Sequence, residues 1–226
     1  MPRPRFLKLN AERRTGILEA AKAEFAESGF EQASYNRIIE RAGLSKGAMY
    51  YYFDDKLDLY VTVLESVNDE MVAFLGMGSD WEPEGDFWDA MTDMGRKGMA
   101  FATSHPELAA LMKSIQSFSA KARKEGRLGE LFDVWRNLLC KLLEHGRERG
   151  EVRTDVPVSL LVEIVVALDE AIDFWLFDHI DELTMPNDET ANDETGPPET
   201  GTGSDEADVS AMVNVVLGFY RRVLAP

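Results

Sequence analysis

Residues 33–56 read ASYNRIIERAGLSKGAMYYYFDDK, and this stretch contains two short helical patterns separated by a glycine. Ser34 can accept a hydrogen bond from the N–H groups of the first turn, which makes it the N-cap of the first helix. Gly43 ends that helix, because glycine adopts a positive φ without a steric clash. In the second helix Met49 and Phe53 lie four residues apart and face inward. Two short helices joined by a tight glycine turn predict a helix-turn-helix unit.

The second helix of such a unit enters the major groove of DNA, so its outward side chains are candidate DNA contacts. Lys46 offers a positive charge for a phosphate or a guanine edge, and Tyr50 and Tyr51 offer hydroxyl donors. Gly47 and Ala48 are small enough for the helix backbone to approach the bases closely. We expect DNA contacts from Ser34, Tyr35, Asn36, Ser45, Lys46, Gly47, Ala48, Tyr50, Tyr51 and Lys56.

Burial in the core is the alternative role for the three consecutive tyrosines at 50–52. Successive residues of a helix point about 100° apart, so all three cannot face inward. Tyr35 and Asn36 lie near the start of the first helix, from which they can reach the flanking DNA backbone. Lys56 stands at the start of the following helix, where its ammonium group adds to the positive end of the helix dipole and favours a bound phosphate.

Residues 44–53, LSKGAMYYYF, resemble the recognition-helix signature of TetR-type transcriptional regulators. Residues 17–21 together with 25–30 resemble that family's first helix and its glycine stop. The resemblance covers roughly residues 13–64 of the 226. Family members commonly carry Thr where this chain has Ala48, so a hydroxyl that could reach a phosphate or a base is missing. This departure bears on sequence preference rather than on DNA binding itself.

The composition is that of a chain with a sizeable core and no membrane anchor. It has 226 residues, of which 45% are hydrophobic. No run of 18 apolar residues occurs, and the N-terminal arginines lack the apolar stretch of a secretory signal. The single cysteine, Cys140, excludes an intramolecular disulfide and is interpreted as a small buried hydrophobe. We expect a cytoplasmic, nucleoid-associated protein.

The net charge of −17 is concentrated away from the helix-turn-helix region. Residues 1–60 contain ten Lys or Arg and nine Asp or Glu, whereas residues 178–208 contain eleven acidic residues and no Lys or Arg. DNA affinity depends on local cations rather than on total charge, although nearby acidity weakens nonspecific binding. The charge distribution is therefore compatible with DNA binding by the first 60 residues.

Apolar residues recur at helical spacing along most of the chain, and no period-two strand pattern occurs. We expect an all-α protein of about nine helices. The predicted domains are a three-helix helix-turn-helix DNA-binding domain at 1–55 and, by the resemblance, a helical ligand-binding and dimerisation domain at 56–226. The segment at about 183–207 is rich in Thr, Asn, Asp, Glu, Pro and Gly, so we expect a disordered acidic loop there.

The first ten residues carry three basic side chains, Arg3, Arg5 and Lys8. One interpretation is a frayed and solvated tail. The other is a basic arm that touches a phosphate or the minor groove. The sequence leaves both interpretations open.

The resemblance implies a small-molecule effector in the second domain and a homodimer built by the last two helices. Met and aromatic residues suit an adaptable apolar cavity, although they more often form core. The candidate pocket residues are Phe74, Phe87, Met91, Met94, Phe101, Met112, Trp135 and Trp175. Broad apolar stripes at about 157–180 and 208–224 favour an interface with a second subunit, with intrachain core as the alternative. The candidate interface residues are Leu161, Val165, Leu168, Ile172, Val213, Val216, Leu217 and Tyr220.

We expect no metal site, no cofactor and no catalytic site. The three histidines, His105, His145 and His179, lie far apart in sequence, and neither a Gly-rich phosphate loop nor a nucleophile elbow occurs. The predicted function is a ligand-responsive regulator, a repressor by the resemblance. It would bind a palindromic double-stranded DNA operator as a homodimer and be released by an apolar or amphipathic effector. The alternative is an all-helical small-molecule binder or enzyme whose helix-turn-helix no longer binds DNA, which Ala48 and the acidic second domain favour.

Overall fold

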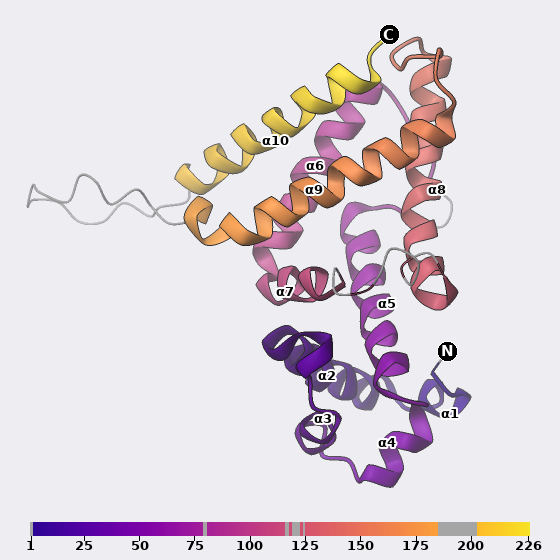
Figure 1. Ribbon diagram of the computed structural model, residues 1–226, viewed down its shortest axis with the longest axis vertical. Helices are drawn as coiled ribbons and strands as arrows, with labels where there is room; N and C mark the ends of the chain where they lie inside the picture. Colours follow the sequence, from indigo (N-terminus) through magenta and orange to yellow (C-terminus); the bar gives the residue numbers. More distant parts are fainter. Residues whose placement is uncertain (1, 79–80, 116–117, 119–122, 124, 185–202) are drawn as a thin grey trace, which may run out of the picture. The chain divides into compact units, whose positions relative to one another are not determined.

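The computed structural model describes residues 2–78, 81–115, 118, 123, 125–184 and 203–226. The residues of this described part form ten helices and no strand, as an all-α prediction requires (Figure 1). The helices are α1 (Pro4–Leu7), α2 (Ala11–Gln32), α3 (Tyr35–Arg41), α4 (Lys46–Tyr52), α5 (Lys56–Leu75), α6 (Phe87–Ser104), α7 (Pro106–Ile115), α8 (Gly126–Glu148), α9 (Val158–Thr184) and α10 (Gly203–Leu224).

The chain divides into two compact units that do not follow the sequence order. Unit 1 comprises Met1–Trp81 and Ala100–Leu138, and unit 2 comprises Glu82–Met99 and Leu139–Pro226. In unit 1, α2 packs against α3, α5 and α7. The division predicted at residue 55 remains a prediction, and α5 packs on α2 within unit 1.

The helix boundaries in unit 1 are set by side-chain caps, as the sequence predicts for α3 and α4. Ser34 accepts a hydrogen bond from the Arg37 N–H at 3.3 Å, and Ser45 accepts one from the Ala48 N–H at 3.2 Å. Between these two helices Gly43 has a φ of 59°, which a side chain would strain. These three local features fix the turn that joins α3 to α4.

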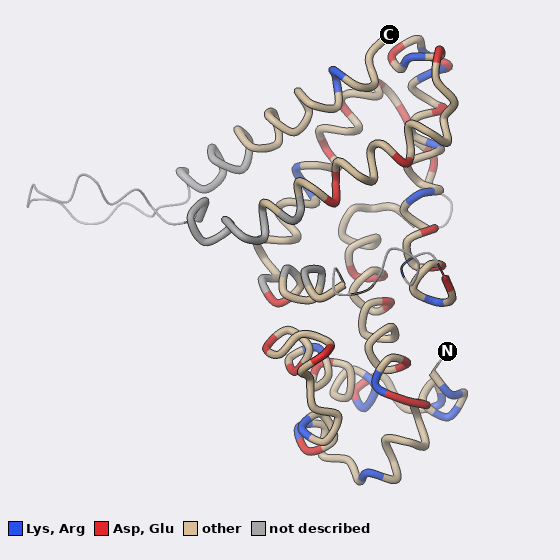
Figure 2. The backbone as a smooth tube through the Cα atoms, in the orientation of Figure 1, with Lys and Arg blue, Asp and Glu red and all other residues tan. Residues whose placement is uncertain are grey.

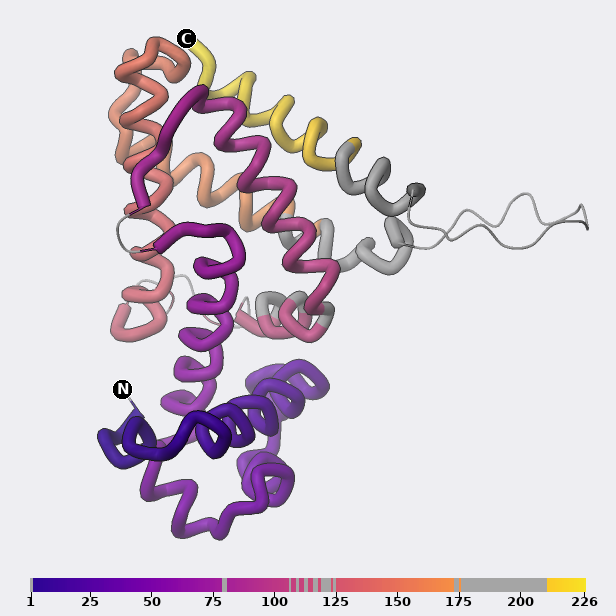
Figure 3. Tube along the Cα trace, turned by 180° about the vertical axis from the view of Figure 1, so that it is seen from behind, coloured from indigo at the N-terminus to yellow at the C-terminus, as the bar shows by residue number. Residues whose placement is uncertain are grey.

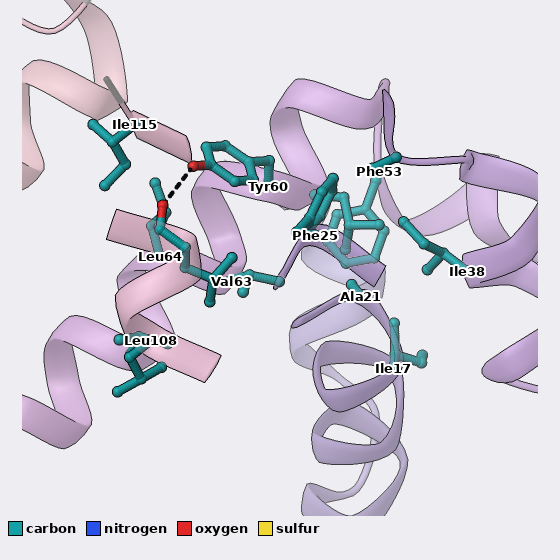
Figure 4. Close-up of a cluster of buried hydrophobic side chains, with 14 of the residues drawn as sticks. Ile17, Ala21, Phe25, Ile38, Phe53, Tyr60, Val63, Leu64, Leu108 and Ile115 are labelled. Carbon is teal, nitrogen blue, oxygen red and sulfur yellow. Dashed lines mark hydrogen bonds between the residues drawn. The ribbon is translucent and has the colours of Figure 1, made fainter. Parts of the chain in front are cut away.

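A single apolar cluster holds the helices of unit 1 together (Figure 4). Phe25 of α2, Ile38 of α3 and Phe53 after α4 are each 0% exposed. Burying a side chain of this size stabilises the fold by about 1.5–3 kcal/mol. The cluster continues to Tyr60 of α5, whose hydroxyl lies 2.5 Å from the Ser114 hydroxyl of α7. The helix-turn-helix is therefore packed into the same core as α5 and α7.

The N-terminus differs from the frayed tail that is one interpretation of the sequence. Residues 4–7 form the short helix α1, and Phe6 is only 2% exposed. Its ring lies 4.8 Å from that of Phe53. The burial depends on the tertiary position of α4, which local sequence does not reveal.

Unit 2 contains the first part of α6, the end of α8, and α9 and α10. Phe87, Leu142, Leu143 and Leu161 are almost fully buried in it. Seen from behind, α6 runs beside α10 (Figure 3). The Arg221 guanidinium of α10 lies 5.1 Å from the centre of the Trp88 ring of α6. Unit 2 is thus a helical layer in which α10 contacts both α9 and α6.

The connection between α9 and α10 is shorter at both ends than the loop predicted at about 183–207. Helix α9 continues to Thr184 and α10 begins at Gly203. Residues 185–202 lie outside the described residues, and the prediction of disorder for them stays a prediction.

Candidate nucleic-acid interface

The outward face of α4 carries the side chains that the sequence predicts as DNA contacts. Lys46 and Gly47 are exposed, and Tyr50 and Tyr51 are 44% and 46% exposed. The opposite face is buried, because Met49 is 0% exposed. The helix therefore separates a core-forming side from a side open to a large ligand.

Each exposed tyrosine of α4 is supported by a side chain from another element. The Tyr50 ring lies 5.3 Å from the Tyr35 ring at the start of α3. The Tyr51 ring has the Arg5 guanidinium of α1 4.0 Å from its centre. Aromatic and cation–π contacts of this kind contribute about 0.5–1.5 kcal/mol each. The two rings are thus held in place before any partner binds.

Tyr35 is half-buried with its ring beside that of Tyr50, and a DNA contact by Tyr35 remains a prediction. Its hydroxyl oxygen is buried without a hydrogen-bond partner in the described part of the chain. Burial raises the pKa of this hydroxyl, so it remains a neutral donor. The neighbouring Asn36 is exposed, as is Ser45, whereas Ser34 and Ala48 are half-buried.

The start of α3 is anchored by a buried carboxylate that sequence reasoning missed. Glu24 of α2 has a fully buried side chain and accepts the Ser34 backbone N–H at 2.8 Å. It also accepts hydrogen bonds from the Arg37 guanidinium, the closest at 2.5 Å. The sequence did offer a signal, because Glu24 falls on the inner side of its helix. Glutamate is rarely buried without a cationic partner, so this position indicates a buried ion pair.

Lys56 has contacts that sequence reasoning did not anticipate. Its ammonium group donates to the carbonyl oxygens of Glu31 at 3.1 Å and Ala33 at 3.2 Å. It also lies 4.8 Å from the centre of the Phe30 ring. The charge therefore stabilises the C-terminal end of α2, where free carbonyl groups favour a cation. A phosphate contact by Lys56 remains a prediction.

The eight candidate pocket residues are divided between the two units. Phe74, Phe101, Met112 and Trp135 belong to unit 1, and Phe87, Met91, Met94 and Trp175 belong to unit 2. The side chain of Met112 lies outside the described residues. The ligand pocket stays a prediction.

The pocket candidates also differ in their surroundings. Phe101 is buried with its ring 5.3 Å from that of Phe74, which is 48% exposed. Trp135 donates its indole N–H to Asn68 at 2.6 Å. In unit 2, Phe87 is 0% exposed and packs on Gly146. Phe87 and Phe101 are therefore structural core residues of their units.

Most of the candidate dimer residues are covered by their own protomer. Leu161, Val165, Val213, Leu217 and Tyr220 are buried, and Leu168, Ile172 and Val216 are half-buried. The Tyr220 hydroxyl donates to the Asp169 carboxylate, which ties α10 to α9. The five buried residues therefore fit the alternative interpretation of the apolar stripes, in which they form core within one protomer.

A different set of apolar side chains on α9 and α10 is exposed. These are Leu160 at 49%, Trp175 at 46%, Val215 at 56% and Phe219 at 48%. Leu160 and Trp175 belong to α9, and Val215 and Phe219 belong to α10. We call these four residues the exposed α9–α10 set.

Within the described residues, no group of three or more His, Cys, Asp or Glu is arranged to hold a metal ion. The same residues contain no helix that is long and apolar enough to span a membrane. His105 and His145 each bond a backbone carbonyl, of Phe101 at 3.0 Å and of Gly85 at 2.9 Å.

The helix-turn-helix region matches a known protein family, and a longer part of the chain is similar to known regulators. Residues 17–63 match the family described as "Bacterial regulatory proteins, tetR family". The uncharacterized HTH-type transcriptional regulator YfiR of Bacillus subtilis is 23% identical over 165 residues, which cover 71% of this chain and 78% of that protein. The HTH-type transcriptional repressor AcnR of Corynebacterium diphtheriae is 28% identical over 149 residues, 66% of this chain and 73% of that protein.

A solved structure shares the fold along almost the whole chain. The transcriptional regulator FadR of Bacillus subtilis, in complex with stearoyl-CoA, has a TM-score of 0.65 at 17% identity and covers 91% of this chain and 96% of that one. Residues 17–63 of this protein therefore carry the helix-turn-helix of the tetR family of bacterial regulatory proteins, and the chain as a whole is similar to transcriptional regulators and shares the all-helical fold of FadR.

Proposed function

We propose that this regulator is a ligand-responsive repressor that binds a palindromic DNA operator as a homodimer. The observation that carries the proposal is the outward face of α4, on which Lys46, Tyr50 and Tyr51 are exposed while Met49 is fully buried. A helix with this division of faces can insert its exposed side into a major groove without disturbing the core.

The exposed residues of α4 suit a mixture of base and phosphate contacts. Lys46 lies at the N-terminal end of the helix, the end that reaches base edges in helix-turn-helix proteins. Its ammonium group can bind a guanine edge or a phosphate. Tyr50 and Tyr51 can donate their hydroxyls to phosphate oxygens. Gly47 adds no side chain that would hold the helix away from the bases.

A second copy of the chain is the partner that the exposed α9–α10 set would bury. Two symmetric copies of this surface would form an isologous contact. Such a dimer would place two α4 helices on half-sites about 34–36 Å apart, one turn of DNA. This assignment replaces the buried residues of the sequence-based interface with Leu160, Trp175, Val215 and Phe219.

An apolar or amphipathic effector is proposed to release the operator. The FadR structure contains stearoyl-CoA, an amphipathic molecule, which makes a long-chain acyl-CoA the first compound to test here. The repressor assignment is supported by AcnR, a named repressor among the relatives. Binding that favours one separation of the two DNA-binding helices would lower operator affinity by shifting the population of states.

A binding experiment with four proteins tests the proposal. Duplexes recovered from a random pool by the wild-type protein are titrated with wild type, Lys46→Ala, Tyr50→Ala and the control Lys97→Ala. Lys97 is a surface lysine of α6 that pairs with Asp93. Each α4 variant should bind about tenfold or more weakly, because a direct contact is lost, and the control should match wild type. Equal affinity of all four proteins would refute DNA binding through α4.

The proposed effector is tested separately, by measuring release of the same duplex from the wild-type protein. Stearoyl-CoA added to the wild-type complex should release the duplex in a concentration-dependent manner. Free CoA serves as the control, because it lacks the acyl chain. Release by neither compound would remove long-chain acyl-CoA as the effector and leave the DNA-binding result standing.

A further inference from the structure

Helix α1 is firmly attached to the C-terminal end of α4. Phe6 is 2% exposed, and its ring lies 4.8 Å from Phe53 and 6.3 Å from Tyr52. The backbone N–H of Arg3 donates to the Tyr52 carbonyl at 2.9 Å. These contacts fix the residues of α1 relative to the exposed face of α4, so that α1 is part of the same surface.

Lys and Arg residues lie close to the N-terminus, where the tube is blue (Figure 2). The side chains of Arg3 and Arg5 differ in their contacts. Arg3 donates two hydrogen bonds to the Asp54 carboxylate, at 2.6 and 2.9 Å, so its charge is neutralised by an ion pair. Arg5 is exposed, and its guanidinium lies 4.0 Å from the centre of the Tyr51 ring. Among the residues that the structure describes, Arg5 takes part in no salt bridge. Arg5 therefore contributes a net positive charge beside Tyr51.

We propose that Arg5 is a further DNA-contacting residue that binds a backbone phosphate beside the groove entered by α4. This inference rests on the proposed function of α4. A guanidinium that lies against an aromatic ring keeps its in-plane N–H groups free, and these match a phosphate in a bidentate geometry.

The position of Arg5 favours a phosphate over a base edge. Tyr51 lies in the last turn of α4, whereas the base-reading end of such a helix is its N-terminus, here Lys46. A residue docked on Tyr51 thus faces the backbone that flanks the groove. The cation–π contact also fixes the arginine rotamer in advance, which lowers the entropy lost on binding.

A purely structural brace is the competing explanation. In that case Arg5 would only hold the Tyr51 ring, and its charge would not face DNA. The two explanations differ in salt dependence, because each phosphate contact releases counterions and steepens the fall of affinity with salt by about 0.9 in the logarithmic slope. The two explanations also make different predictions for Arg5→Lys, because lysine keeps the charge but loses the planar stack on the Tyr51 ring.

The test measures affinity by fluorescence anisotropy at several salt concentrations, with a duplex selected by the wild-type protein. Arg5→Ala is compared with Arg5→Lys and with Arg3→Ala, which changes the net charge by the same amount on the same helix. Arg5→Ala should lower affinity about 10- to 100-fold and reduce the slope by about 1.8 for two subunits. Arg5→Lys should keep the slope and lose severalfold in affinity, and Arg3→Ala should stay within threefold of wild type.

The outcomes separate this inference from the proposal on which it rests. A wild-type protein that selects and binds no duplex would refute the function of α4, and the role of Arg5 with it. Normal wild-type binding with an unchanged slope in Arg5→Ala would overturn the role of Arg5 alone. Equal losses of DNA affinity in Arg5→Ala and Arg3→Ala would mean that the effect comes from net charge alone, which would also overturn a specific phosphate contact by Arg5. A loss confined to duplexes with A·T pairs at the flank would indicate minor-groove reading instead.

Discussion

The Arg37 guanidinium of α3 donates to the buried Glu24 carboxylate of α2 at 2.5 Å. The same carboxylate accepts the backbone N–H of Ser34 at 2.8 Å. Hydrogen bonds from Arg37 lower the pKa of Glu24, which outweighs the opposing effect of burial. One carboxylate therefore fixes the start of α3 on α2, and with it the turn that presents α4.

Replacing Glu24 should destabilise the helix-turn-helix. Glu24→Gln keeps the shape but removes the charge that holds Arg37 and Ser34, and we expect a loss of about 1–3 kcal/mol in the free energy of unfolding. The control is Glu27→Gln, because Glu27 pairs with Arg41 on the surface with 59% of its side chain exposed. Urea denaturation at pH 7 measures both. Equal unfolding midpoints for wild type and Glu24→Gln would contradict this assignment.

The Glu24 contribution should also depend on pH. Because the folded-state pKa lies below that of the unfolded chain, the stabilisation is fully present above the unfolded value of about 4.3. It is lost as the pH falls through the lowered folded-state pKa. The stability curves of wild type and Glu24→Gln should therefore converge as the solution becomes more acidic than pH 4. A gap that stays constant over this range would mean that the carboxylate charge is not the source of the difference.

Two glycines of unit 2 give a matched pair for testing the packing there. A Cβ on Gly146 of α8 would lie 2.6 Å from a Val152 methyl and 2.8 Å from the Phe87 ring, whereas one on Gly98 of α6 meets nothing within 4 Å. Gly146→Ala should cost about 1–3 kcal/mol by overpacking. Gly98→Ala should be neutral or stabilising, since alanine favours helices. The midpoint of thermal unfolding distinguishes the two variants. A Gly146→Ala protein as stable as wild type would refute the close packing of Gly146 against Val152 and Phe87.

The exposed α9–α10 set should control the oligomeric state. Phe219→Glu places a charge on this surface and should shift the mass measured by light scattering from twice 25.4 kDa to 25.4 kDa. Val134→Glu is the control, because Val134 is also exposed, at 42%, but lies on α8 in unit 1. It should leave the mass unchanged. A dimeric Phe219→Glu protein, or a control that dissociates equally, would place the interface elsewhere.

The local parts of the fold were predictable from the sequence because local chemistry sets them. Ser34, Gly43 and Ser45 cap and end the helices as expected, and Met49 and Phe53 are buried as their spacing predicts. These features depend only on neighbouring residues and helical geometry.

The remaining features depend on contacts between distant residues, which periodicity does not reveal. The burial of Phe6 requires Phe53, and the position of Arg5 requires Tyr51. On α9 the apolar stripe is broad, so spacing alone could not separate Leu161, which faces the core, from Leu160, which is exposed. Of the eight interface residues predicted from the sequence, five are buried within the protomer and three, Leu168, Ile172 and Val216, are half-buried, so the interface itself stays a prediction.

Selection of duplexes from a random pool by the wild-type protein tests the central claim most directly. The account predicts enrichment of one palindrome whose half-sites are centred about one helical turn apart, 10–10.5 base pairs. It also predicts that a Lys46→Ala, Tyr50→Ala double variant enriches no such sequence. A wild-type pool without an enriched palindrome, or the same palindrome recovered by the double variant, would contradict recognition of DNA through α4.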